Sequence, residues 1–154
     1  MREYHYRVDG EGRIFHDGTE IVDAPTLRLF VMAMQPTPDG RHLVMCQGER
    51  NWFAAEDTPL VVQRLGLRVD GGRLLVVELG LAGGHREALD PATLETGRGH
   101  LYCRVRRGQI VARFGRVPMQ QLAPFLTGDG NAGGAALMLD GARHPIADRA
   151  SVTT

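Results

Sequence analysis

Short turn signals built around glycine recur along the whole chain and restrict how its extended segments can pair. They lie at residues 9–12, 17–18, 39–40, 48–49, 70–72, 107–108 and 140–141. Parallel strands need a connection of roughly a dozen residues or more, whereas antiparallel strands can follow one another across a tight turn. The segments beside these turns are therefore expected to form antiparallel hairpins, about ten short strands in total.

One segment of the first half has the pattern of a helix instead. Asp23 precedes Ala24 and Pro25, and an acidic N-cap followed by proline in the first turn is a common helix start. Four apolar residues then recur with helical spacing and form one stripe: Leu27, Phe30, Val31 and Met34. We expect a helix over residues 24–35 and a second, shorter one over residues 118–126.

Together these elements predict an α+β fold. The helix at 24–35 packs on an antiparallel sheet, and a β-rich second half closes into a small sandwich or a partial barrel. We divide the chain into an α+β lobe at residues 1–82, a β-rich lobe at 83–147 and a frayed tail at 148–154. A length of 154 residues also suits one compact domain, so this alternative stays open.

The composition disfavours several classes of protein. Eighteen basic and eighteen acidic residues cancel, which argues against a nucleic-acid binder, since such proteins usually carry a basic excess. No apolar run approaches the roughly 18 residues of a membrane span, and the N-terminus carries no recognisable secretory signal. Cys46 and Cys103 form no CxxC pair. We therefore expect a cytoplasmic protein whose thiols are free rather than joined in a single disulfide.

Motifs that would indicate a cofactor or a catalytic nucleophile are missing from the sequence. The six histidines have no metal-ligand spacing such as HxH or HExxH. A phosphate-binding loop of the GxxxxGKS/T type is absent, and the single serine of the chain is not part of a GxSxG motif. We expect no metal and no cofactor, and the sequence leaves open whether the protein is an enzyme.

The densest group of hydrogen-bonding side chains lies at residues 49–57 and surrounds the only tryptophan of the chain. Its members are Glu49, Arg50, Asn51, Trp52, Glu56 and Asp57. In a functional interpretation, Arg50 and Asn51 offer donors to an anionic or amide-bearing ligand while Trp52 stacks on it. In a structural interpretation, Arg50 pairs with Glu56 or Asp57 across a bend. The residues alone do not decide between the two.

Two blocks of the sequence resemble an uncharacterised family, UPF-0598 (also DUF4505). The opening REYHYRVD at residues 2–9 is similar to the family's REYxYxVD, and ERNW at 49–52 with ED at 56–57 is similar to its ERNFxxxED, with tryptophan in place of phenylalanine. A more distant similarity to the DUF1285 family rests on FHDGT at 15–19 and EDTP at 56–59. Neither family has an assigned activity. The second resemblance implies an α+β N-terminal part and a β-rich C-terminal part.

The first resemblance links the first strand with the segment at 49–57, because these are its two most similar blocks. Tyr4 and Tyr6 lie two residues apart in that strand and therefore share one face. We expect the two segments to meet in space, with Tyr4 or Tyr6 near Arg50, Asn51 or Trp52 in one ligand-binding concavity. The alternative is that the tyrosines face the core and Trp52 fills a gap between the lobes.

The leading functional hypothesis is a non-enzymatic binding or interaction module for an unknown small molecule or protein, without nucleic-acid or membrane partners. The alternative is a small enzyme in which Glu49, Glu56 or Asp57 acts as acid or base and Arg50 clamps an anion. A homodimer formed through an exposed sheet edge is compatible with either hypothesis.

Overall fold

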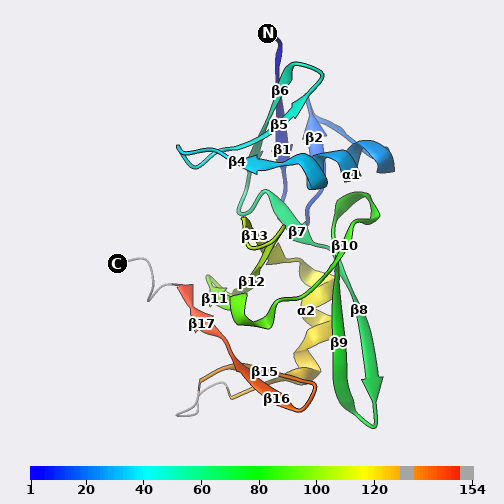
Figure 1. Ribbon diagram of the computed structural model, residues 1–154, viewed down its shortest axis with the longest axis vertical. Helices are drawn as coiled ribbons and strands as arrows, with labels where there is room; N and C mark the ends of the chain where they lie inside the picture. Colours follow the sequence, from blue (N-terminus) through cyan, green and yellow to red (C-terminus); the bar gives the residue numbers. More distant parts are fainter. Residues whose placement is uncertain (129–133, 150–154) are drawn as a thin grey trace.

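The computed structural model describes residues 1–128 and 134–149 of the chain. Figure 1 shows an elongated molecule, with the N-terminal strands and the first helix at one end and the C-terminal hairpins at the other. Most of the predicted tail at 148–154 lies outside the described residues. Within the described ranges, each helix is too short or too polar to cross a membrane.

The elements follow one another in a mixed order of strands, two α-helices and three short 3₁₀ helices labelled η. The first half contains β1 (Glu3–Val8), β2 (Ile14–His16), β3 (Thr19–Glu20), α1 (Ala24–Ala33), β4 (Gln35–Pro36), β5 (His42–Cys46), β6 (Glu49–Ala55), β7 (Leu60–Val62), β8 (Arg64–Asp70) and β9 (Arg73–Gly80). The second half contains η1 (Ala82–Gly84), β10 (Arg86–Ala88), η2 (Pro91–Thr93), β11 (Glu95–Gly97), β12 (His100–Val105), β13 (Ile110–Phe114), α2 (Arg116–Leu122), η3 (Ala123–Phe125), β14 (Leu126–Thr127), β15 (Ala136–Leu139), β16 (Ala142–Pro145) and β17 (Ala147–Asp148).

The N-terminal sheet has six strands in the order β3-β2-β1-β6-β5-β4. The hairpin predicted around residues 9–12 is confirmed, because β1 and β2 pair antiparallel. β5 and β6 also pair antiparallel, around the glycine turn predicted at residues 48–49. β1 and β6 lie side by side in the middle of the sheet and pair in parallel. Helix α1 crosses one face of this sheet (Figure 1).

Helix α1 forms as the sequence predicts, because both its cap and its apolar stripe are satisfied. The Asp23 side chain accepts a hydrogen bond from the Thr26 backbone N–H at 3.1 Å. The stripe faces the sheet, where the Phe30 ring lies 5.0 Å from the Tyr6 ring and 4.9 Å from the Phe53 ring, centroid to centroid. The aromatic contacts thus anchor α1 over the two central strands.

The lower half contains a five-stranded sheet, β17-β11-β12-β13-β7, and two three-stranded sheets, β10-β9-β8 and β14-β15-β16. The hairpins predicted around residues 71, 107 and 141 are confirmed as β8–β9, β12–β13 and β15–β16. Helix α2, the predicted second helix, binds the edge of β8 through one side chain. The Leu65 N–H donates to Gln121 Oε1 at 2.8 Å, and Gln121 Nε2 donates to the Leu65 carbonyl at 3.1 Å.

The structure corrects one part of the predicted fold, because not all strand pairs are antiparallel. The pairs β1–β6, β7–β13 and β11–β17 are parallel. Each joins segments far apart in the sequence, so the intervening chain supplies the crossover that a short turn cannot. The described residues form open, mixed sheets and no closed barrel, and the α+β class is confirmed. The division after residue 82 stays a prediction; β7, from the first predicted lobe, pairs with β13 from the second.

Replacing Phe30 by Ala should lower the free energy of unfolding by about 3–5 kcal/mol, because a buried aromatic ring is lost between α1 and the sheet. Phe30 is 5% exposed, whereas Met32 in the same helix is 56% exposed. Met32→Ala is therefore the matched control, with an expected change below about 0.5 kcal/mol. Chemical denaturation measures both values. A loss under about 1 kcal/mol for Phe30→Ala would show that the stripe does not hold the helix in place.

Candidate functional site

The two segments singled out in the sequence lie side by side, as predicted. β1 and β6 are neighbouring strands in which Tyr4 is opposite Asn51 and Tyr6 is opposite Phe53. These four side chains belong to one face of the sheet, because alternate residues of a strand point the same way. The rings of Tyr6 and Phe53 both contact Phe30, so this is the face beneath α1.

Two candidate residues on this inner face, Asn51 and Glu49, occupy positions that suit a structural role. Asn51 is buried, and its Nδ2 donates to the Val44 carbonyl at 3.1 Å, which fastens β6 to β5. Glu49 lies on the same face of β6, and its Oε2 atom is buried without a hydrogen-bond partner in the described part of the chain. Tyr4, Asn51 and Glu49 are therefore separated by the sheet from the candidate residues of the outer face.

Arg50 and Trp52 lie on the outer face, and the predicted pairing of Arg50 with Glu56 or Asp57 is wrong. Arg50 Nη1 lies 3.5 Å from Glu3 Oε1, which also accepts a hydrogen bond from Trp52 Nε1 at 3.3 Å. The hydrogen bond from Trp52, aided by Arg50, lowers the pKa of the Glu3 carboxyl. β6 is one uninterrupted strand, so the expected bend is absent and roughly 20 Å of extended backbone separates Arg50 from Glu56.

Glu56 and Asp57 follow β6 and bind different partners. Glu56 accepts a hydrogen bond from the Gly10 N–H at 3.1 Å and lies 3.6 Å from the Arg7 guanidinium. Asp57 instead accepts a hydrogen bond from the Tyr102 hydroxyl at 2.5 Å. Asp57 thereby joins a polar cluster between the N-terminal sheet and the five-stranded sheet.

We call this group the junction cluster; it consists of Glu11, Asp57, His100, Tyr102 and Arg113. Arg113 is its centre, with a side chain that is 14% exposed and a guanidinium 3.6 Å from Asp57 and 3.7 Å from Glu11. Arg113 Nη2 also donates to the Gly10 carbonyl at 2.6 Å. One largely buried cation therefore connects the turn after β1, the segment after β6, and β13.

Hydrogen bonding sets the donor and acceptor roles within the junction cluster. Arg113 Nη1 lies 3.4 Å from His100 Nε2, and because a guanidinium only donates, Nε2 is the acceptor in this contact. Burial, together with the bond to Asp57, raises the pKa of the Tyr102 hydroxyl, so Tyr102 stays a donor. Within the described residues the polar contacts of Asp57 all go to Oδ2. Its Oδ1 makes no hydrogen bond with the described residues.

The sequence analysis missed four members of the junction cluster, namely Glu11, His100, Tyr102 and Arg113. All of them lie more than forty residues from Asp57 in the chain, so no local spacing links them to it. One usable signal was the predicted hairpin around Gly108. Its observed register sets Tyr102 opposite Arg113, which makes these two a candidate pair once the hairpin is accepted.

A hollow of about 410 Å³ opens beside Asp57 at the end of β6. Its walls include His5, Arg41, His42, Trp52, Asp57 and Pro59, together with Tyr6, and we call it the junction hollow. The Arg41 guanidinium lies 4.0 Å from the Trp52 ring centroid, and its Nε donates to Asp39 at 2.9 Å. Burial lowers the pKa of the His42 imidazole, which is therefore neutral at pH 7 and can donate and accept.

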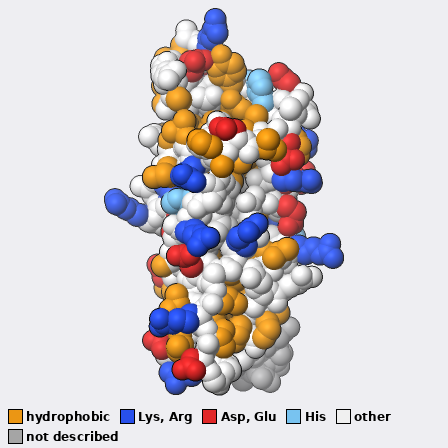
Figure 2. Space-filling model, turned by 90° about the vertical axis from the view of Figure 1, so that its right-hand side faces the viewer, with side chains coloured by type: hydrophobic (Ala, Val, Ile, Leu, Met, Phe, Trp, Pro, Cys, Tyr) orange, Lys and Arg blue, Asp and Glu red, His pale blue; other side chains and the backbone are white. Residues whose placement is uncertain are grey.

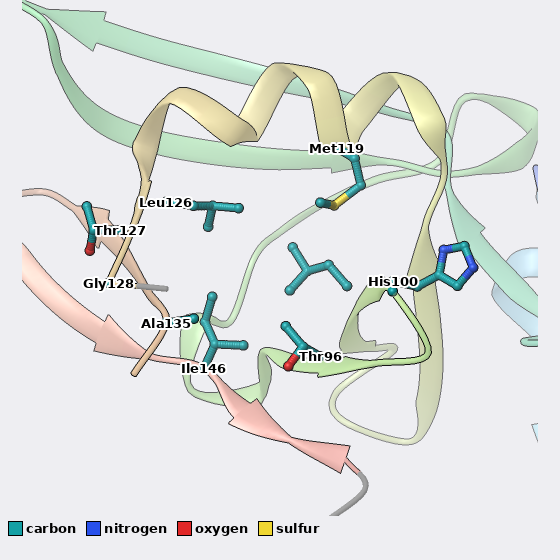
Figure 3. A pocket seen from close by; sticks show the side chains of 10 residues that line it. Thr96, His100, Met119, Leu126, Thr127, Gly128, Ala135 and Ile146 are labelled. Carbon is teal, nitrogen blue, oxygen red and sulfur yellow. The ribbon is translucent and has the colours of Figure 1, made fainter. Parts of the chain in front are cut away.

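A second cavity, of about 570 Å³, lies in the lower half (Figure 3). We call it the apolar cavity and define it by Thr96, Leu101, Met119, Leu126, Ala135 and Ile146. These residues come from β11, β12, α2, β14 and the two ends of the β15–β16 hairpin. His100 also borders the cavity, but its ring is turned out of it (Figure 3). The sequence analysis selected none of these residues.

The fold resembles that of two solved bacterial proteins. A crystal structure of a DUF1285 family protein from Silicibacter pomeroyi matches with a TM-score of 0.70 and 17% identity, covering 99% of this chain and 86% of that chain. Another, from Shewanella baltica, matches with a TM-score of 0.55 and 18% identity, covering 72% of this chain and 84% of that chain. No family model and no curated protein matches the chain. These likenesses show a shared fold, and the resemblance to UPF-0598 stays a prediction.

Replacing Tyr102 by Phe should lower the free energy of unfolding by about 1.5–3 kcal/mol, because Asp57 then loses a hydrogen bond inside a buried cluster. Tyr6→Phe is the matched control, since the Tyr6 hydroxyl makes no hydrogen bond within residues 1–128 and 134–149. Adding Asp57→Asn completes a double-mutant cycle, with an expected coupling of about 1 kcal/mol or more. Urea denaturation provides the four values, and equal losses for the two tyrosine variants would contradict the role of the hydroxyl.

Proposed function

We propose that the protein is a non-enzymatic binding module that takes a small molecule into the junction hollow. The observation that carries this proposal is the state of Asp57. Tyr102 and Arg113 hold one carboxylate oxygen, and the other is left without a polar contact in the described residues. A fixed acceptor beside an indole and a proline, Trp52 and Pro59, is a common makeup of a small-ligand site, in which apolar walls surround a few directed polar groups.

The charges around the junction hollow favour an uncharged ligand. Asp57 is balanced by Arg113 at 3.6 Å, and Arg41 is balanced by Asp39 at 2.9 Å. A ligand with a net charge would therefore meet no unbalanced partner, and its desolvation would not be repaid. A neutral N–H group suits the free oxygen of Asp57. The ligand that fits best is a small carboxamide or a similar neutral donor with an apolar body.

The enzyme hypothesis receives less support from the geometry. Arg50, the intended anion clamp, is bound to Glu3 at 3.5 Å, and Glu49 and Glu56 lie at opposite ends of β6. The described residues contain no group of three or more His, Cys, Asp and Glu side chains arranged to hold a metal ion. An acid–base mechanism needs its groups within hydrogen-bond reach of one substrate, and these carboxylates are too far apart for that.

We extend the proposal to the family of the protein, its cellular compartment and its binding partners. We assign the chain to the DUF1285 family, which the shared fold and the EDTP block at residues 56–59 support. We infer a bacterial cytoplasmic protein, in keeping with the free thiols of Cys46 and Cys103. Figure 2 shows arginine and acidic side chains interspersed over one face of the molecule, which supports the expectation that nucleic acid is not a partner. The predicted homodimer remains a hypothesis.

Benzamide should bind in the junction hollow and change the fluorescence of Trp52, which is the only tryptophan and part of the wall. Methyl benzoate has a similar shape but no N–H donor, so it should bind at least about tenfold more weakly. Titration of the protein with each compound under tryptophan-selective excitation measures both dissociation constants. Equal affinities for the two compounds, or no spectral change with either, would overturn the proposal.

Asp57→Asn is the variant that tests the role of the carboxylate. Its amide oxygen is expected to face the donors of Tyr102 and Arg113, so its NH₂ group would meet the N–H of benzamide, and affinity should fall about tenfold. Glu56→Gln makes the same chemical change one residue away, at a side chain outside the wall, and should leave affinity unchanged. Equal effects of the two variants would show that Asp57 does not contact the ligand.

A further inference from the structure

The apolar cavity lies where three elements diverge. Helix α2 covers it from one side, β11 and β12 form the second side, and β14 with the ends of the β15–β16 hairpin forms the third (Figure 3). Leu101 in β12 is 1% exposed, whereas Met119, Leu126 and Ile146 are only half-buried and turn their side chains toward the space. The cavity is therefore a gap between well-packed elements, lined by side chains whose burial is incomplete.

The side chains of the wall are mainly apolar and carry no charged group. Leucine, methionine, alanine and isoleucine side chains form half of it, two glycines and the threonines Thr96 and Thr127 contribute as well, and no Asp, Glu, Lys or Arg belongs to it. The imidazole of His100 is turned away and lies against Arg113. Within the described residues the Thr96 hydroxyl has no hydrogen-bond partner, and it lies among the apolar side chains in Figure 3. It is a polar group that a ligand in the cavity would reach.

We propose that the apolar cavity binds an uncharged apolar small molecule that carries at most one hydroxyl or carbonyl group. A charged ligand would lose its hydration and gain no ionic partner from such a wall. An apolar ligand gains free energy in proportion to its surface removed from water, and it completes the burial of Met119, Leu126 and Ile146. A single oxygen on the ligand would pair with the Thr96 hydroxyl.

The volume of the apolar cavity limits the size of the ligand. A dry cavity of roughly 150 Å³ is enough for benzene, and the apolar cavity measures about 570 Å³. It therefore suits a fused aromatic compound or a medium-length aliphatic alcohol, within the usual range of ligand pockets. Because Trp52 and Asp57 are not part of its wall, this site is separate from the junction hollow, and either proposal can fail without the other.

N-phenyl-1-naphthylamine, an uncharged dye that brightens in apolar surroundings, is the probe for the cavity. It should bind the unmodified protein and shift the methyl NMR signal of Met119, which is identified by its loss in Met119→Leu. Met32 on α1 is exposed and lies outside the wall, so its methyl signal is the internal control and should not move. Dye binding without a shift of the Met119 signal, or no dye binding at all, would overturn the proposal.

Two variants locate the dye and test the polar contact. Ala135→Phe fills the cavity and should weaken dye binding at least tenfold, while Ala142→Phe, at an exposed position of the same hairpin, should change it less than twofold. Thr96→Val keeps the volume but removes the hydroxyl. It should weaken displacement of the dye by 1-nonanol about twofold to tenfold and leave displacement by nonane unchanged.

The outcomes of these variants are decisive in both directions. A folded Ala135→Phe protein that binds the dye as the unmodified protein does would place the dye elsewhere and overturn the proposal. If Ala135→Phe fails to fold, the Met119 signal of the unmodified protein decides. Equal responses to 1-nonanol and nonane in Thr96→Val would remove the hydroxyl from the proposal and restrict the ligand to hydrocarbons.

Discussion

The connection between the two ends of the molecule depends on the contacts of one largely buried guanidinium, that of Arg113. Burying a cation is costly unless hydrogen bonds and opposite charges compensate for the lost hydration. Arg113 finds these partners for its two Nη atoms in the carbonyl of Gly10, the carboxylates of Glu11 and Asp57, and the ring of His100, while its Nε atom is buried without a hydrogen-bond partner among the described residues. A Cβ atom at residue 10 would lie 2.3 Å from Arg113 Nη2, so glycine there is what admits the guanidinium. The junction hollow contains Asp57 in its wall and the apolar cavity is bordered by His100; both cavities therefore share this support.

The parts of the fold that could be predicted from the sequence are those fixed by neighbouring residues. Asp23 and the stripe through Phe30 specify α1 within about a dozen residues, and each glycine turn specifies its own hairpin. The parallel pairs were out of reach because they unite strands with a helix or several strands between them. For β1 and β6, nothing in either strand indicates the direction of the other. The similarity of the two blocks to one family predicted that they meet, which is confirmed, but not that they run in parallel.

In the candidate site, too, the residues close together in the sequence could be predicted and their distant partners could not. Trp52 and Asp57 were selected because they stand in one dense polar segment, and both line the junction hollow. The predicted partner of Arg50 was wrong because the prediction required a bend. In the straight strand β6, the Arg50 side chain instead lies beside Glu3 of the neighbouring strand. The residue that balances Asp57 is Arg113, from a strand in the other half of the molecule. A partner at such a separation becomes visible only once the sheets are assembled.

The contact between Gln121 and Leu65 has a consequence for assembly. An unpaired strand edge offers its backbone as a template on which a strand of another chain can add. The amide of Gln121 presents one donor and one acceptor to Leu65 of β8, at 3.1 and 2.8 Å, as the next strand would. A helix side chain therefore stands in for a missing strand and ends the growth of the sheet at that point. An incoming chain would have to displace this amide before it could pair with β8 at Leu65.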